Sequence, residues 1–150
     1  MKRLTNPLLH ILLIHLILFM GACGQSFEQV PDEQADKEQI SIARTITDEY
    51  FKVLEEGGTY DFTGKATAVF IKSFTPEAQR KSHEQMTSQF GTFESMEYAE
   101  TWTNKVGSEL TIVRFKAKFS KTEADLEVRV VLDSQNMVGG FWMKPWQDEL

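Results

Sequence analysis

Two stretches in the C-terminal half alternate between apolar and charged residues, and they constrain the fold more than any other feature. In residues 113–119 and 124–132 every second residue is apolar. A period of two is typical of strands with one buried and one solvent-facing side. The sequence therefore predicts two antiparallel strands whose apolar sides face a core. The positions between the apolar ones are mostly charged: Arg114, Lys116, Lys118, Asp125, Glu127 and Arg129.

A strand is predicted on each side of this pair. After Gly91 the helical period ends, and a first long strand with Met96, Tyr98 and Trp102 leads to a turn at 104–107. A last strand is predicted over Met137–Trp146. Its Gly139-Gly140 pair suggests a bulge or a close approach to other backbone.

The charged residues also predict how the two middle strands pair. Their apolar rows stay on one side only if paired residue numbers sum to an odd value. A sum of 241 sets Arg114 opposite Glu127, whereas 243 sets it against Arg129. Opposite charges are favoured by a few tenths to about 1 kcal/mol per pair, so the sequence favours 241. That sum also pairs Lys118 with Glu123 and Lys116 with Asp125.

Helices are predicted before the strands. The first begins after Asp36 and ends at Gly57-Gly58, because its apolar residues recur at three and four positions and a cap precedes them. A shorter helix is expected over 61–70, and a third starts at Thr75-Pro76 and ends at Gly91. The expected fold class is α+β, with N-terminal helices packed on a curved four-stranded antiparallel sheet.

The N-terminus has the order of an export signal: basic residues, an apolar run of about 15 residues, then small residues before a cysteine. Met20-Gly21-Ala22-Cys23 resembles the lipobox of bacterial lipoproteins. The resemblance implies cleavage before Cys23 and acylation of that cysteine, which anchors the protein to a membrane. Gly24 favours an outer membrane, with the protein facing the periplasm of a bacterial cell envelope. The alternative is an ordinary secretory signal followed by an unrelated cysteine.

Three segments follow from this interpretation: a signal peptide over 1–22, an acidic flexible tether over 23–38 and a folded domain over 39–150. The segment 24–39 has five acidic residues and one lysine, which is too polar to fold alone. Without the signal the chain keeps 14 basic and 22 acidic residues, a net charge of −8. Nucleic acid is therefore not an expected partner.

The domain resembles the NTF2-like superfamily, and in particular small bacterial lipoproteins of unknown function. The resemblance covers about residues 40–146 and depends on the order of elements and on two motifs, Gln89-Phe90-Gly91-Thr92-Phe93 and Val138-Gly139-Gly140-Phe141-Trp142. It implies a cone-shaped pocket between sheet and helices, used for catalysis in some members and for binding or dimerisation in others. The cystatin-like fold shares much of this architecture, and fold alone does not assign an activity.

The residue inventory favours a binding domain over an enzyme. After the signal, His83 is the only histidine, and Cys23 is the only cysteine in the chain. Because the lipobox resemblance implies that Cys23 is acylated, no thiol is free and a Cys-His pair is excluded, and no metal or other cofactor is expected. The enzymatic alternative is chemistry of the ketosteroid-isomerase kind, which needs a carboxylate base and hydroxyl donors in an apolar cleft. Its candidate residues are Tyr50, Asp61, Tyr98 and Glu100.

Two binding surfaces are predicted. An inner pocket for a small apolar ligand would be lined by Tyr50, Tyr98, Trp102, Phe115 and Phe141. The alternative, which the sequence favours, is that the aromatic residues pack in the core or at its rim. An apolar patch on the outer face would comprise Leu110, Ile112, Val131 and Trp142, and a homodimer or an envelope-protein partner would cover it.

Overall fold

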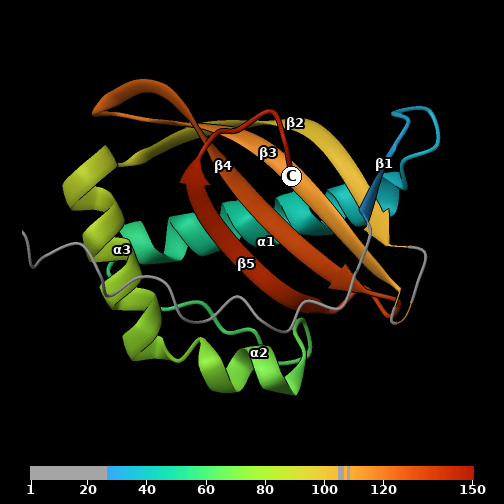
Figure 1. Cartoon of the computed structure of the whole chain (residues 1–150). Helices are drawn as coiled ribbons and strands as arrows, with labels where there is room; N and C mark the ends of the chain where they lie inside the picture. The colour runs from blue at the N-terminus through green and yellow to red at the C-terminus, as the bar shows by residue number, and fades with distance from the viewer. Residues whose placement is uncertain (1–26, 105–106, 108) are drawn as a thin grey trace, which may run out of the picture.

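The computed structural model describes residues 27–104, 107 and 109–150 and has an α+β fold (Figure 1). Within this part of the chain, antiparallel strands form a single sheet in the order β1-β2-β3-β4-β5. The prediction of four strands is therefore wrong by one, while the fold class is confirmed. The strands are β1 (Phe27–Val30), β2 (Phe93–Asn104), β3 (Leu110–Phe119), β4 (Thr122–Asp133) and β5 (Val138–Pro145). The helices are α1 (Lys37–Glu55), α2 (Ala68–Ser73) and α3 (Pro76–Phe90).

The additional strand, β1, lies in the segment that composition assigned to a flexible tether. Phe27–Val30 pair with the end of β2, with Phe27 opposite Asn104 and Val30 opposite Thr101. An edge strand this short needs little apolar burial of its own, because the neighbouring strand supplies its hydrogen-bond partners. Polar composition therefore did not exclude it.

Helix α1 begins and ends where the sequence predicts. The Asp36 carboxylate accepts hydrogen bonds from the backbone N–H groups of Glu38 and Gln39, at 2.8 and 3.4 Å. After the helix, Gly57 adopts φ = 81°, a left-handed conformation that suits glycine. Helix α3 is likewise capped by Thr75 and ends before Gly91. Helix α2 begins later than predicted, at Ala68, with Thr67 as its cap.

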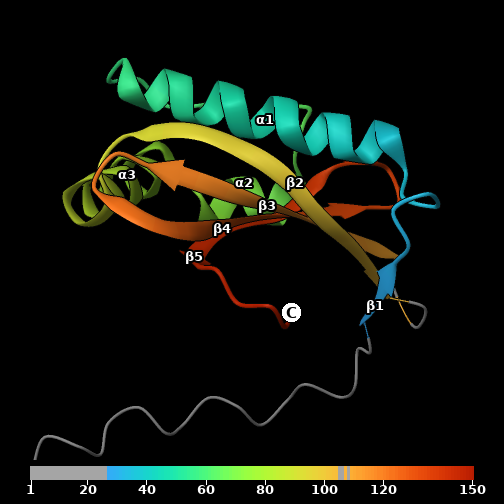
Figure 2. The same cartoon turned by 90° about the horizontal axis from the view of Figure 1, so that it is seen from above.

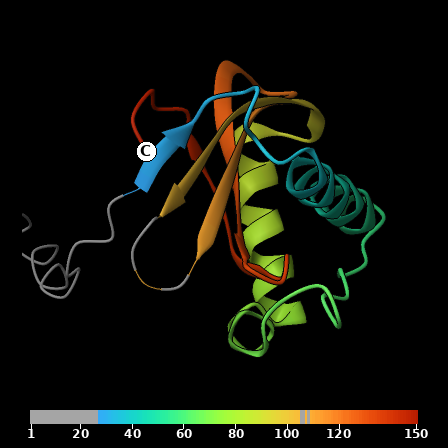
Figure 3. The ribbon, with the colours of Figure 1, turned by 90° about the vertical axis from the view of Figure 1, so that its right-hand side faces the viewer.

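The helices lie on one side of the sheet, and the C-terminal segment lies on the other (Figures 2 and 3). The side covered by helices is the inner face, and the opposite side is the outer face. Helix α1 supplies Ile46, Tyr50, Phe51 and Leu54 to the core. These pack against the inner row of the middle strands, which includes Val113, Phe115, Leu126, Val128 and Val130.

The register between β3 and β4 differs from the predicted one. Arg114 lies opposite Arg129, and Lys116 lies opposite Glu127, so the paired numbers sum to 243. The like-charged pair is tolerated because Glu127 forms ion pairs with both arginines, at 2.9 and 2.5 Å. The prediction considered only charges directly opposite each other. It therefore missed Glu127, which lies diagonally across from Arg114 and two residues before Arg129 on the same strand.

A bulge in β2 changes the direction of Trp102. Tyr98 pairs with Phe115 and Glu100 pairs with Arg114, which leaves Ala99 as an extra residue. Tyr98 precedes the bulge and shares the inner face with Phe115. Trp102 follows it and pairs with Ile112, so it lies on the outer face. The prediction that both aromatic residues line one inner pocket is therefore wrong for Trp102.

Candidate binding groove on the outer face of the sheet

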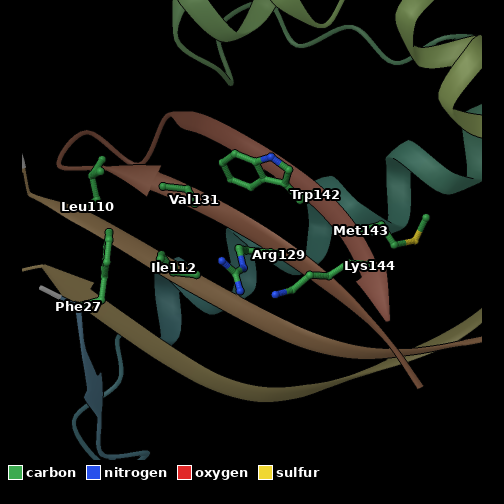
Figure 4. Close-up of a pocket in the computed structure, with 8 residues that line it drawn as sticks. All are labelled: Phe27, Leu110, Ile112, Arg129, Val131, Trp142, Met143 and Lys144. Carbon is green, nitrogen blue, oxygen red and sulfur yellow. The ribbon is translucent and has the colours of Figure 1, made fainter. Parts of the chain in front are cut away.

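A groove of about 420 Å³ lies on the outer face (Figure 4). The residues that line this outer groove come from strands β1, β3, β4 and β5. The outer groove includes all four residues of the predicted apolar patch. Its lining residues are Phe27, Leu110, Ile112, Arg129, Val131, Trp142, Met143 and Lys144.

The floor of the outer groove follows from strand pairing. Ile112 pairs with Val131, and Val131 pairs with Gly140. Directly opposed residues of antiparallel strands project from the same face. This row therefore puts two branched apolar side chains and one glycine next to each other on the outer face.

Gly140 leaves space for the side chain of Trp142, which forms one wall of the outer groove. A Cβ atom at this position would overlap the six-membered ring of Trp142, so that indole lies directly over the glycine. A bulge brings this arrangement about, because Leu132 pairs with Val138 while Val131 pairs with Gly140. The predicted bulge at Gly139-Gly140 is confirmed, whereas the group close to Gly140 is the Trp142 side chain rather than other backbone. Trp142 remains 53% exposed.

One end of the outer groove is cationic. The Nε of Arg129 lies 2.5 Å from one Glu127 oxygen, and the Lys144 Nζ lies 3.5 Å from the other. The Arg129 Nη2 is buried and has no hydrogen-bond partner among the described residues. A buried donor without a partner costs about 1–3 kcal/mol.

Next to this end, Arg114 is completely buried on the outer face. Its guanidinium forms ion pairs with Glu100 and with Glu127 and donates a hydrogen bond of 2.6 Å to the Gln147 carbonyl. The ring of Trp146 covers it, with its centroid 4.3 Å from the guanidinium carbon. The C-terminal segment thus closes this end of the outer face.

The charges of the network determine the protonation of Glu127. Burial raises the pKa of Glu127, but hydrogen bonds and ion pairs with Arg114 and Arg129 outweigh it, and the net pKa is lowered. Glu127 is therefore ionised at neutral pH. Three cations, Arg114, Arg129 and Lys144, contact two carboxylates, Glu100 and Glu127, which leaves one excess positive charge.

The predicted inner pocket is filled by its own residues. Tyr50 and Phe115 are buried, and the Tyr50 ring lies 4.9 Å from Phe141 and 5.9 Å from Phe74. The cavity between these rings, α3 and β5 has a volume of only about 50 Å³. Ligand pockets usually measure about 300–1,000 Å³. These aromatic residues therefore act as core in this structure.

The residues proposed for isomerase-like chemistry do not converge. Tyr50 lies in the core, where burial raises its pKa, and Tyr98 shares the inner face. Glu100 lies on the outer face, paired with Arg114. Asp61 is exposed in the loop before α2 and accepts a hydrogen bond from the Thr63 N–H. Burial chiefly raises the pKa of Tyr98, and the charge of Glu100 adds the smallest contribution. In the described part of the chain no hydrogen bond joins a carboxylate of this set to either tyrosine.

A polar cluster that sequence analysis missed joins α1 to the loop before α2. The Tyr60 hydroxyl donates to Glu49 at 2.6 Å, and the Lys65 ammonium lies 3.0 Å from the same carboxylate. The hydrogen bond from Tyr60 and that from Lys65 lower the pKa of Glu49. Glu49 and Lys65 are solvent-exposed, whereas Tyr60 is buried, and the cluster holds the loop to the helix.

Among the described residues, no three or more His, Cys, Asp and Glu side chains form a group that could hold a metal ion. His83 lies on α3, with its Nε2 3.4 Å from the Thr87 hydroxyl. Also within this part of the chain, no helix has the length and apolar character needed to cross a membrane.

The sequence analysis missed four residues of the outer groove: Phe27, Arg129, Met143 and Lys144. Phe27 was placed in the tether, and Arg129 and Lys144 were not connected to the apolar patch. The pairing of Arg129 with Trp142 depends on the register between β4 and β5, which alternation alone does not determine.

Comparisons with protein-family models, with curated proteins and with solved structures each find no match. The NTF2-like resemblance therefore stays a prediction. The lipobox, with Cys23, lies outside the described residues, and acylation of that cysteine is a prediction as well.

Proposed function

We propose that this chain is a non-catalytic binding protein, anchored by a lipid on Cys23 to a bacterial membrane, and that the outer groove is its binding site. The observation that carries the proposal is the contrast between the two faces. The inner face has a cavity of about 50 Å³, whereas the outer face has a groove of about 420 Å³ with apolar walls. Only the second has the size of a ligand pocket.

The position of the predicted anchor supports the same site. Cys23 precedes Phe27 by four residues, so covalent geometry limits the distance between their Cα atoms to about 14 Å. Phe27 itself lines the outer groove. A lipid on Cys23 would hold this face close to the membrane surface, in the outer membrane if the protein is sorted there.

Mass spectrometry of the mature N-terminus tests the anchor. We expect a chain that begins at Cys23 and carries acyl groups. An intact signal or an unmodified cysteine would contradict this part of the proposal.

Binding is tested with the full chain in lipid nanodiscs and a neutral apolar fluorescent probe such as phenylnaphthylamine, with empty nanodiscs as background. We expect saturable binding that Trp142→Ala weakens by about tenfold, because one wall of the groove is lost. Val69→Ala is the matched control, since Val69 is 80% exposed on α2 and lies outside the groove. Equal binding by the two variants, or no binding at all, would contradict the proposal.

A further inference from the structure

The outer groove is apolar at one end and cationic at the other, and we infer that it binds a single-chain amphiphile with a carboxylate head, such as a fatty acid anion. The inference rests on the proposed function and names its ligand class. In Figure 4 Phe27, Leu110 and Ile112 lie toward one end, while Lys144 lies toward the other. An acyl chain matches the first end, and an anion matches the second.

The cationic end has charge and hydrogen-bond donors to offer. Glu127 is the carboxylate that Arg129 and Lys144 share, and it also neutralises Arg114. Glu100 pairs with Arg114, and its other oxygen accepts from Gln29 at 2.8 Å. One positive charge is left over in a chain whose total charge is −6.

The hydrogen bonds of Arg129 point to the same ligand. A guanidinium has five N–H donors and no acceptor. Its Nε is used by Glu127, while its Nη2 is buried and unpaired within the described residues. Arg129 lines the groove, and a carboxylate accepts from a guanidinium N–H through a charge-assisted hydrogen bond, whereas an alcohol accepts more weakly and an ammonium group is repelled.

The size of the outer groove favours one acyl chain. A volume of about 420 Å³ lies in the lower half of the range of ligand pockets, about 300–1,000 Å³. Its apolar floor and wall, formed by Ile112, Val131 and Trp142, come from three adjacent strands and make a continuous surface. A chain lying across these strands would place its head beside Arg129 and Lys144.

The test uses two photoreactive probes on the full chain in membranes. One is a diazirine-bearing hexadecanoate, and the other is the corresponding hexadecanol, which has the same chain without the charge. Labelled peptides are identified by mass spectrometry, and labelling of β3, β4 and β5 is normalised to labelling of α2. We expect the carboxylate to label the groove strands about tenfold more than the alcohol does.

Two variants test the cationic end. Lys144→Gln and Arg129→Gln should each remove most of the preference for the carboxylate probe. Lys144→Gln is the safer of the two for folding, because its side chain is partly exposed. Lys118→Gln is the matched control, since Lys118 is a lysine of the same face, paired with Asp125 at 2.6 Å and outside the groove. It should leave the preference unchanged.

The outcomes separate the inference from the proposed function. Equal groove labelling by both probes, or a preference that survives Lys144→Gln and Arg129→Gln, overturns the inference and leaves an apolar binding site. No groove labelling by either probe, as expected if a second copy or a protein partner covers the face, overturns the inference as well. In that case binding of the neutral fluorescent probe decides whether the groove takes a small ligand.

Discussion

Replacing Glu127 by glutamine should destabilise the protein far more than an ordinary surface change. The carboxylate is completely buried and faces Arg114 at 2.9 Å, Arg129 at 2.5 Å and Lys144 at 3.5 Å. Glutamine preserves the shape and removes the charge. Arg114, itself without solvent exposure, would then keep Glu100 as its only ion-pair partner among the described residues.

The size of the effect follows from burial. Removing one partner of a buried ion pair costs about 3–5 kcal/mol, because the remaining charge is left without compensation. Domains of this size are stable by only about 5–15 kcal/mol, so the loss would be a large fraction of the total. We therefore expect the free energy of unfolding to fall by about 3 kcal/mol or more.

The measurement is urea unfolding of the chain without residues 1–22 and with Cys23→Ser, followed by circular dichroism. Asp125→Asn is the matched control: it lies on the same strand, loses the same charge and breaks an ion pair with Lys118, but its side chain is about one-third exposed. Exposed pairs contribute about 0.2–1 kcal/mol. The reasoning about buried charge is wrong if Glu127→Gln lowers the free energy of unfolding no more than Asp125→Asn does, with the same dependence on urea concentration in both variants.

Other predictions concern pH, the groove wall and the core. Because the folded pKa of Glu127 is lowered from its ordinary value of 4.5, its contribution to stability is present above pH 4.5 and is lost as the pH falls through the folded pKa. As the pH falls, the free energy of unfolding should decrease more steeply in the wild type than in Glu127→Gln. Gly140→Ala should displace Trp142 and change its emission, whereas Gly139→Ala, with no atom nearer than a carbonyl oxygen at 4.0 Å, should not. Phe51→Ala should cost about 3–5 kcal/mol, since its buried ring stacks on Phe93 at 4.4 Å, against less than about 0.5 kcal/mol for Val69→Ala.

Local signals in the sequence predicted the parts of the fold that depend on local physics. Asp36, Thr75, Gly57 and Gly91 determine where α1 and α3 begin or end, through side-chain caps and left-handed glycines. The alternating rows of β3 and β4 were also correct, and they turned Leu110, Ile112 and Val131 outward. That is why the apolar part of the outer groove could be predicted.

The predictions were wrong where the pairing of two strands depends on contacts with a third strand or with the C-terminal segment. The register of β3 against β4 depends on Glu100 from β2 and on the C-terminal segment, which together surround Arg114. The bulge at Ala99 is a displacement of β2 against β3, and no alternation in β2 alone reveals it. The strand β1 exists because β2 offers it an edge. Composition and the counting of charge pairs describe residues that are neighbours along one strand or across two strands. The register, the bulge and β1 each depend on contacts with a further strand or segment.

The outer groove and the buried ion network share one row of β4, and this sharing links ligand binding to stability. Glu127, Arg129 and Val131 project from the same face at alternate positions, so the row runs from a buried carboxylate through a cation to an apolar wall. Glu127 holds the Nε of Arg129 and thereby competes with any anion in the groove for that guanidinium. Glu127→Gln should therefore act in opposite directions: it lowers the free energy of unfolding and raises the labelling of the groove by the carboxylate probe relative to the alcohol. A variant that loses stability without any gain in this preference would show that Arg129 serves the ion network alone, and that the cationic end of the groove is formed by Lys144.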